Sequence, residues 1–313
     1  MSEETVNRLL IYWKLCYNII ANNGFLGVKI VKIEELIADK NIEVFDSRNM
    51  PFEVDAMSHF AIADSLVNEA GRLEKAFVHF WPTDKTVFLG MQDTKLPYFS
   101  DALEVIKDSE YDFVVRNSGG LGVVADSGIL NFSLIVPLDS EVPFSIDEGY
   151  EVMFAIIKKA LGEDIDAVEI KQSYCPGDFD LSIDGRKIAG ISQRRRAGGV
   201  AIMIYISIDG DQAVRSRLMK TFYEVGQQGE KTRWDFPEVD PEQMTTVSDA
   251  NAHNITVEET IALIKDALRD YGATLTEGQF SQDILDDYKE SYEGMIKRNK
   301  KMLGDAFPTK EAE

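Results

Sequence analysis

Between about residues 75 and 210, short runs of β-branched and aromatic residues alternate with stretches of helical periodicity. Such alternation is typical of a layered α/β or α+β architecture. The predicted strands lie at 76–81, 86–89, 112–115, 129–136, 179–183, 187–193 and 200–208, and the predicted helices at 53–70, 99–108 and 147–161. After residue 211 helical periodicity dominates, over 211–226, 256–271 and 281–303, with a proline-bearing connector between Phe236 and Ala252. We therefore predict a mixed β-sheet flanked by helices, with a helical C-terminal segment.

Charge and length restrict the class of protein. The 313 residues can bury one large domain or two, and the formal net charge of −21 repels phosphate at long range. Met1–Glu4 lacks the basic region of a signal peptide, and no segment approaches the roughly 18 uncharged apolar residues that a transmembrane helix requires. We expect a cytoplasmic protein whose partners include neither nucleic acid nor a membrane.

The N-terminal region and the cysteines complete this outline. Leu9, Leu10, Trp13, Tyr17 and Ile20 recur at helical spacing, so residues 6–21 could form an amphipathic helix, and packing on the protein body is favoured over membrane contact. The only two cysteines, Cys16 and Cys175, lie far apart and form no CxxC motif, and the three histidines are scattered. The sequence predicts neither a disulfide framework nor a metal site.

A glycine-rich segment, Arg116-Asn117-Ser118-Gly119-Gly120-Leu121-Gly122, separates two predicted strands. Glycines allow the backbone to approach a ligand closely or to adopt positive φ. The segment matches neither a Walker loop nor a dinucleotide fingerprint, because a strand follows where a helix should. Two interpretations remain open at this point: a tight structural loop, or a ligand cradle formed by Arg116, Ser118, Gly119, Gly120 and Gly122.

A lone cysteine occupies a turn-rich stretch, Ser173-Tyr174-Cys175-Pro176-Gly177-Asp178. A cytosolic cysteine is most often an inert small hydrophobic residue. Here Pro176-Gly177 forces a turn and the flanking residues are polar, so the thiol can face a cleft. A catalytic thiol acts as its thiolate, which a nearby cation or backbone N–H groups would favour.

Asp184-Gly185 between two alternating runs predicts a β-hairpin. The hairpin brings Lys187 back toward the loop of Cys175. Strict alternation places Lys187, Ala189 and Ile191 on one face, and the small Ala189-Gly190 pair would let a ligand lie against the strand. The alternative is a solvated lysine at the hairpin end.

Five segments in this order carry a resemblance: Gly90–Asp93, Arg116–Gly120, Ser127–Asn131, Ser173–Gly177 and Asp184–Gly190. Together they resemble the biotin/lipoyl protein ligase and octanoyltransferase family, and within it the octanoyl-[glycine cleavage H protein]:protein N-octanoyltransferases. The similarity runs from about residue 29 to 270. It implies an N-terminal extension at 1–28, a catalytic domain at 29–235 and the helical segment at 236–313.

The resemblance also implies a chemistry. The residue matching Cys175 attacks the acyl group, and the one matching Lys187, twelve positions later as in the family, holds the acyl carbonyl. The donor would be an octanoylated lysine of glycine cleavage H protein, and the acceptors would be lipoyl-domain lysines of 2-oxoacid dehydrogenases, with no cofactor. The chain departs from the common pattern at Asn117, where many members have arginine, and at Ala125-Asp126, where many have histidine. These departures weaken the case for a ligase that binds nucleotide.

Three alternatives stay open. An octanoyl-acyl-carrier-protein transferase would use the same cysteine, an ATP-dependent lipoate ligase would act without it, and a non-enzymatic module would only bind lipoyl domains.

A run of three arginines, Arg194-Arg195-Arg196, has two interpretations. It forms either a basic patch on which a lipoyl domain docks, with Arg186 and Lys187 nearby in the sequence, or a solvated turn.

Overall fold

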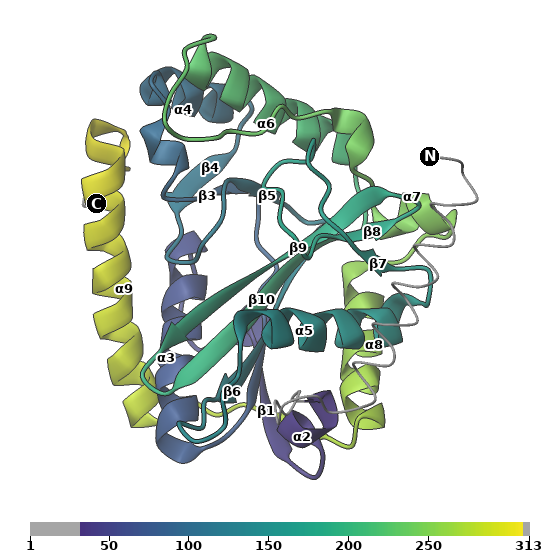
Figure 1. Ribbon diagram of the computed structural model, residues 1–313. Coiled ribbons are helices and arrows are strands. Elements are labelled where there is room, and N and C mark those ends of the chain that lie inside the picture. The colour runs from purple at the N-terminus through teal and green to yellow at the C-terminus, as the bar shows by residue number, and fades with distance from the viewer. Residues whose placement is uncertain (1–31, 309–313) are drawn as a thin grey trace. The chain divides into compact units, whose positions relative to one another are not determined.

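The computed structural model in Figure 1 describes residues 32–308. The helix predicted at 6–21, the extension 1–28 and Cys16 all lie outside the described residues. Among residues 32–308, no helix combines the length and apolarity needed to cross a lipid bilayer.

Two β-sheets and eight α-helices of the described chain form the architecture. The large sheet contains β1 (Asn41–Asp46), β2 (Phe77–Phe80), β6 (Ile129–Pro137), β7 (Asp166–Ala167), β8 (Leu181–Ile183), β9 (Arg186–Arg196), β10 (Gly199–Ser207) and β11 (Thr274–Glu277). The small sheet contains β3 (Thr86–Leu89), β4 (Asp112–Val115) and β5 (Val123–Ala125). The longer helices are α3 (Ala56–Leu73), α4 (Phe99–Asp108), α5 (Ile146–Leu161), α6 (Gln212–Gln227), α8 (Val257–Asp270) and α9 (Gln282–Leu303), and the short ones include α2 (Ile33–Ile37) and α7 (Val247–Asn251).

The large sheet is mixed, with strand order β11-β1-β2-β6-β10-β9-β8-β7. The pairs β11–β1 and β1–β2 are parallel, and every pair from β2 to β7 is antiparallel. In the small sheet β3 lies between a parallel β4 and an antiparallel β5. The sheet is therefore mixed, as the sequence predicts.

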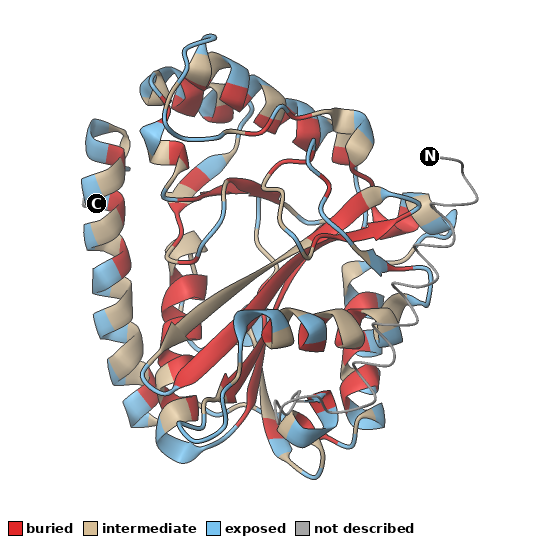
Figure 2. Ribbon diagram, viewed as in Figure 1, coloured by how far each residue is buried: buried red, intermediate tan, exposed pale blue. Residues whose placement is uncertain are grey.

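Helices cover both faces of the large sheet (Figure 1). Side chains of α3 pack on one face of β2, β6 and β10, and α9 lies along α3. The other face packs against α5 and α8, and this cluster holds most of the aliphatic core. Figure 2 shows the central strands buried and the outward side of α9 exposed. The site described below lies where the large sheet meets the small one.

Local sequence signals explain where several helices begin. Reciprocal side-chain and backbone hydrogen bonds form a capping box at the start of α3, α5 and α8, through the pairs Asp55 and Ser58, Ser145 and Glu148, and Thr256 and Glu259. Such boxes satisfy N–H groups that the first helical turn leaves without partners. The amphipathic pattern that follows each box determines which side of the helix faces the sheet.

Within residues 32–308, every strand and helix predicted from periodicity has a counterpart within a few residues, which confirms the predicted fold class. The predicted strands do not include the short β5 and β7, nor β1 and β11, the two strands at one edge of the large sheet. Because β11 joins this sheet, the C-terminal segment is not wholly helical. The described residues from Ile33 onward form one compact unit, and the boundary at residue 235 remains a sequence-based prediction.

Candidate active site

Cys175 lies on a loop of unusual backbone conformation. Its φ of 51° places a non-glycine residue in the left-handed region, which costs free energy unless the surroundings hold it. The half-buried side chain faces a cavity of about 540 Å³. A strained residue beside a cavity is a frequent feature of functional sites, and the contacts of Cys175 define what this site can do.

The cavity wall is largely aromatic, with a few polar groups close to Cys175. The rings of Phe60, Trp81 and Phe88 pack on one another, with centroids 5.2 to 5.7 Å apart. Tyr150, Phe179 and Tyr205 also line the cavity. A concave apolar space with polar groups gathered at one place suits a ligand with an apolar chain and a reactive polar end.

Two N–H donors point at the sulfur of Cys175. The backbone N–H of Leu121 lies 3.1 Å from Sγ, and Nη2 of Arg116 lies 3.5 Å from it. The same Nη2 donates to the carbonyl oxygen of Leu121 at 2.7 Å. Both N–H groups are therefore held beside the sulfur, where they can donate to an acceptor next to it.

The glycine-rich segment wraps around this contact. Gly120 has a φ of 96°, and a Cβ there would lie 2.5 Å from Nη2 of Arg116 and 3.0 Å from Sγ of Cys175. Ser118 and Gly119 also line the cavity, whereas Gly122 does not. The N–H of Gly122 instead donates to the hydroxyl of Tyr223, at 3.2 Å. Among the cradle residues predicted from sequence, the structure brings all but Gly122 to the cavity.

Lys187 lies close to the Cys175 loop, as the hairpin predicts, but it is not a solvated surface residue. Its exposed fraction is 0 %, so the alternative of a solvated lysine at the hairpin end is wrong. Nζ lies 2.7 Å from the carbonyl oxygen of Cys175, 3.2 Å from that of Tyr174 and 3.2 Å from Oγ of Ser173. It also forms an ion pair with Asp180 at 2.8 Å. An ammonium group has three N–H bonds, and these four acceptors occupy all of them.

Asp180 holds both sides of the same loop. Its Oδ2 accepts hydrogen bonds from the N–H groups of Ile170 and Gly177, each at 3.2 Å. Burial raises the pKa of Asp180, although Lys187 and these N–H groups act in the opposite direction. The sequence alone assigns Asp180 no role.

A β-bulge explains where the neighbours of Lys187 point. Ser182 on β8 pairs with Lys187, but the preceding Leu181 pairs with Ala189, so Ile188 is an extra residue on β9. Ile188 and Ala189 both pack in the core beneath α5, while Gly190 lines the cavity close to Lys187. The predicted common face for Lys187 and Ala189 is therefore wrong, because strict alternation does not hold across a bulge.

Comparison with known proteins identifies the family. Residues 55–269 match the family described as the lipoyl protein ligase A/B catalytic domain. The chain belongs to this family. A Listeria monocytogenes protein named lipoyl-[GcvH]:protein N-lipoyltransferase is 41% identical over 278 residues, which cover 87% of this chain and 100% of that protein. Proteins named octanoyl-[GcvH]:protein N-octanoyltransferase are each 40% identical, one from Macrococcus caseolyticus (79% of this chain, 90% of that protein) and one from Staphylococcus aureus (80% and 91%).

Solved structures agree on the fold of this lipoyl protein ligase A/B family member. A bipartite lipoate protein ligase from Thermoplasma acidophilum matches with a TM-score of 0.61 at 16% identity, covering 88% of this chain and 100% of that one. A lipoate-protein ligase A bound with ATP matches equally well, with a TM-score of 0.61 at 16% identity, covering 81% of this chain and 94% of that one. The family resemblance stated from five short segments is thus confirmed, and so is the fold that it implies.

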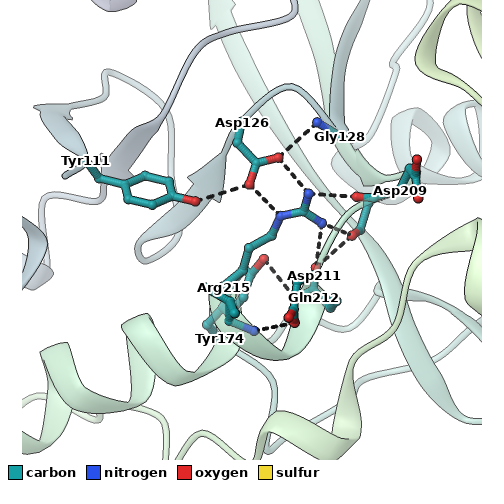
Figure 3. Close-up of polar contacts among 10 residues, drawn as sticks. Tyr111, Asp126, Gly128, Tyr174, Asp209, Asp211, Gln212 and Arg215 are labelled. Atoms are coloured by element: carbon teal, nitrogen blue, oxygen red, sulfur yellow. Dashed lines mark hydrogen bonds and ion pairs between the residues drawn. The ribbon is translucent and has the colours of Figure 1, made fainter. Parts of the chain in front are cut away.

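In this family member, a polar network fixes Tyr174, the residue before Cys175 (Figure 3). The hydroxyl of Tyr174 accepts a hydrogen bond from Gln212 of α6 at 3.2 Å. Oε1 of Gln212 accepts from Ser207, whose hydroxyl in turn accepts from Arg215. Arg215 pairs with Asp126 through two contacts of 2.6 and 2.8 Å. Burial opposes ionisation of Asp126, but Arg215 holds its pKa below the usual value. Asp126, one of the departures from the family pattern, thus supports the site without facing the cavity.

The three consecutive arginines of this family member do not form one basic patch. Arg194 and Arg196 form ion pairs with the buried Asp64 of α3, at 2.9 and 2.7 Å, and Asn117 donates to the same carboxylate at 3.1 Å. Arg195 points the other way and donates to the carbonyl oxygens of residues 144 and 145. All three belong to strand β9, so neither the docking patch nor the solvated turn describes them.

Asp93 is a buried group to which the sequence reading assigned no role. Its side chain accepts hydrogen bonds from the N–H of Gly90 at 2.7 Å and from the hydroxyl of Tyr223 at 3.0 Å. Burial raises its pKa to about 6. Its place in the segment Gly90–Asp93, one of the five that carry the resemblance, was the one available signal.

Proposed function

We propose that this protein is a cytoplasmic acyltransferase that moves octanoyl or lipoyl groups between protein lysines. The donor would be acylated glycine cleavage H protein, and the acceptors would be lipoyl domains of 2-oxoacid dehydrogenases. The observation that carries the proposal is the sulfur of Cys175, which faces an apolar cavity and receives two N–H donors. The printed names of the relatives, which specify transfer from GcvH, support the choice of donor.

A thioester on Cys175 would connect the two half-reactions. The thiolate attacks the donor amide carbonyl, the C–S bond forms, and the carbonyl π electrons move to oxygen. This pair then re-forms the carbonyl as the C–N bond breaks, and the departing lysine nitrogen takes a proton from solvent, which replaces the proton that the thiol released. The acceptor lysine reverses the sequence: its nitrogen forms the new C–N bond, the C–S bond breaks, and one proton is released. Both ends are lysine amides, so the transfer is close to thermoneutral and requires no nucleotide.

Lys187 has a supporting position in this proposal. Its Nζ contacts the carbonyl oxygen of Cys175 and not the sulfur. To hold an acyl carbonyl, as the family resemblance implies, it would have to exchange one of its four present acceptors for the substrate. In the unliganded site we assign it the task of holding Cys175 in the left-handed conformation. Ala189 lies in the core, so we assign contact with substrate at this strand to Gly190.

Intact-mass measurement tests the proposal directly. Incubation with octanoylated H protein in nucleotide-free buffer should add one octanoyl group to the wild-type enzyme and none to the Cys175→Ser variant. The Cys16→Ser variant serves as the matched control and should acylate normally. Lipoylated and octanoylated donors are to be compared, because the named relatives include both activities.

Other results would identify the alternatives. Transfer should also run from an octanoylated lipoyl domain back to apo-H protein, because donor and acceptor bonds are chemically alike. A strict requirement for ATP with free octanoate would indicate a ligase, and transfer only from octanoyl-acyl carrier protein would indicate the other transferase. Full transfer by Cys175→Ala would contradict the thioester mechanism.

A further inference from the structure

Arg116 is a buried cation with no ion-pair partner in the described part of the chain. Only 7 % of its surface is exposed. The other buried cations near the site are paired, Lys187 with Asp180 and Arg215 with Asp126. Among residues 32–308, no carboxylate lies within ion-pair distance of Arg116, and the charge of Asp93 reaches it only at longer range. Burying an unpaired charge is costly, so such a residue persists where an anion is to be bound.

The guanidinium is placed beside the reacting atom. Nη2 lies 3.5 Å from Sγ of Cys175, and Nε is buried without a hydrogen-bond partner among the described residues. The guanidinium also forms part of the cavity wall. A carbonyl carbon bonded to Sγ would carry its oxygen only two bonds from the sulfur. That oxygen would therefore lie within reach of the donors that now point at the sulfur.

We propose that Arg116 is a catalytic residue whose guanidinium, together with the N–H of Leu121, stabilises the oxyanion formed when Cys175 attacks the acyl carbonyl. The inference rests on the proposed acyl transfer. When the C–S bond forms, the carbonyl π pair becomes the negative charge on oxygen, and Arg116 and Leu121 donate to it. When the C–N bond breaks, the pair returns to the carbonyl and these hydrogen bonds weaken. These hydrogen bonds are therefore strongest in the transition state, so they lower the activation free energy of acylation.

The surroundings of Arg116 favour this assignment over Lys187. Every N–H of Lys187 already has an acceptor, whereas Nε of Arg116 has none. The contact of Nη2 with the carbonyl oxygen of Leu121 fixes the plane of the guanidinium. Gly120 leaves the space that the guanidinium and the sulfur share, since a Cβ there would lie 2.5 Å from Nη2. The donors are thus fixed in place before substrate arrives, as electrostatic stabilisation of a transition state requires.

Single-turnover acylation of Cys175 by octanoylated H protein tests the role. Arg116→Gln should lower the acylation rate at saturating donor by about 10² to 10³, the usual effect of removing one oxyanion donor, while half-saturation changes little. Arg116→Lys keeps the buried charge and should fold if Arg116→Gln does not. It should still acylate at least about tenfold more slowly than wild type, because an ammonium cannot reproduce a planar, bidentate contact.

A second measurement distinguishes an effect of Arg116 on the oxyanion from an effect on the amount of thiolate. Alkylation by iodoacetamide measures how much thiolate each variant holds at each pH. At a pH where alkylation of wild type and variant is equally fast, the acylation deficit should remain. Disappearance of the deficit at that pH, or a wild-type acylation rate in either variant, would overturn the assignment. Absence of any acyl adduct on the wild-type enzyme would instead refute the proposed acyl transfer itself.

Discussion

Asp93 shows how one buried carboxylate can affect stability near neutral pH. Its folded-state pKa of about 6 lies above the ordinary value of 3.8, so the folded chain binds this proton more tightly than the unfolded chain. The resulting stabilisation is full below pH 3.8 and is lost as pH rises through about 6. The span between the two values corresponds to about 3 kcal/mol.

We predict that the free energy of unfolding of wild type, minus that of Asp93→Asn, falls by about 2 kcal/mol between pH 4.5 and 7.5. Urea denaturation at both pH values measures it. The comparison with the variant is necessary because burial lowers the pKa of His59 to about 4, which changes stability in the opposite direction over the same range. A difference that does not depend on pH would mean that Asp93 titrates normally.

The ion pair of Lys187 and Asp180 leads to a second prediction for single residues. Lys187→Met leaves a carboxylate buried without its cation, which should cost about 3–5 kcal/mol of unfolding free energy. Adding Asp180→Asn removes the uncompensated charge and should recover part of that loss. The exposed Lys171→Met is the control and should change little. Equal stability of Lys187→Met and wild type, measured by urea denaturation, would show that the pair contributes nothing.

At the scale of elements, the glycine-rich loop offers a matched pair of neighbours. At Gly119 a Cβ meets no atom within 4 Å, whereas at Gly120 it would collide with Arg116 and φ is strongly positive. We predict that Gly119→Ala transfers normally and that Gly120→Ala transfers about 10²-fold more slowly, because a displacement near 1 Å at the reacting groups has an effect of that size. Transfer rates and melting temperatures of both variants test this. Similar transfer rates of the two variants would show that the conformation of this loop does not affect catalysis.

The strands and helices near the site show what sequence alone can predict. Periodicity predicted β9 and β10 because β9 has a long alternating pattern and β10 a long apolar run. The Asp184-Gly185 turn correctly predicted that Lys187 lies near Cys175. The exposed four-residue strand β11 lacked that pattern and was missed. The burial of Lys187 and the approach of Arg116 to Sγ depend on contacts between distant segments, which no local pattern encodes.

At the scale of the whole molecule, the C-terminal helix reaches the start of the active-site loop. Asn299 of α9 is fully buried and pairs with both backbone groups of Val115, accepting from its N–H at 2.6 Å and donating to its carbonyl oxygen at 3.1 Å. Arg116 is the next residue. Asn299 lies 184 residues after Val115 in the sequence. Its side chain therefore makes the hydrogen bonds that a neighbouring strand would make on this side of β4.

We predict that Asn299→Leu destabilises the fold by about 1–3 kcal/mol, because it leaves two buried backbone groups without partners. Amide hydrogen exchange of a peptide covering 112–118 should become faster, and acyl transfer should slow with it. Lys297→Ala, at an exposed position of the same helix, is the control. Unchanged exchange at 112–118 would show that α9 does not hold the loop.

The extra residue Ile188 has a consequence for how chains of this kind can vary in length. Removing Ile188 would restore simple pairing between β8 and β9 and would leave the later side chains of β9 on their present sides of the sheet, because Ile188 and Ala189 already share one side. Gly190 would stay in the cavity wall, and Arg194 and Arg196 would stay beside Asp64. A single deletion further along β9, such as that of Ile191, would instead turn every later side chain to the opposite side and would move Arg194 and Arg196 away from Asp64.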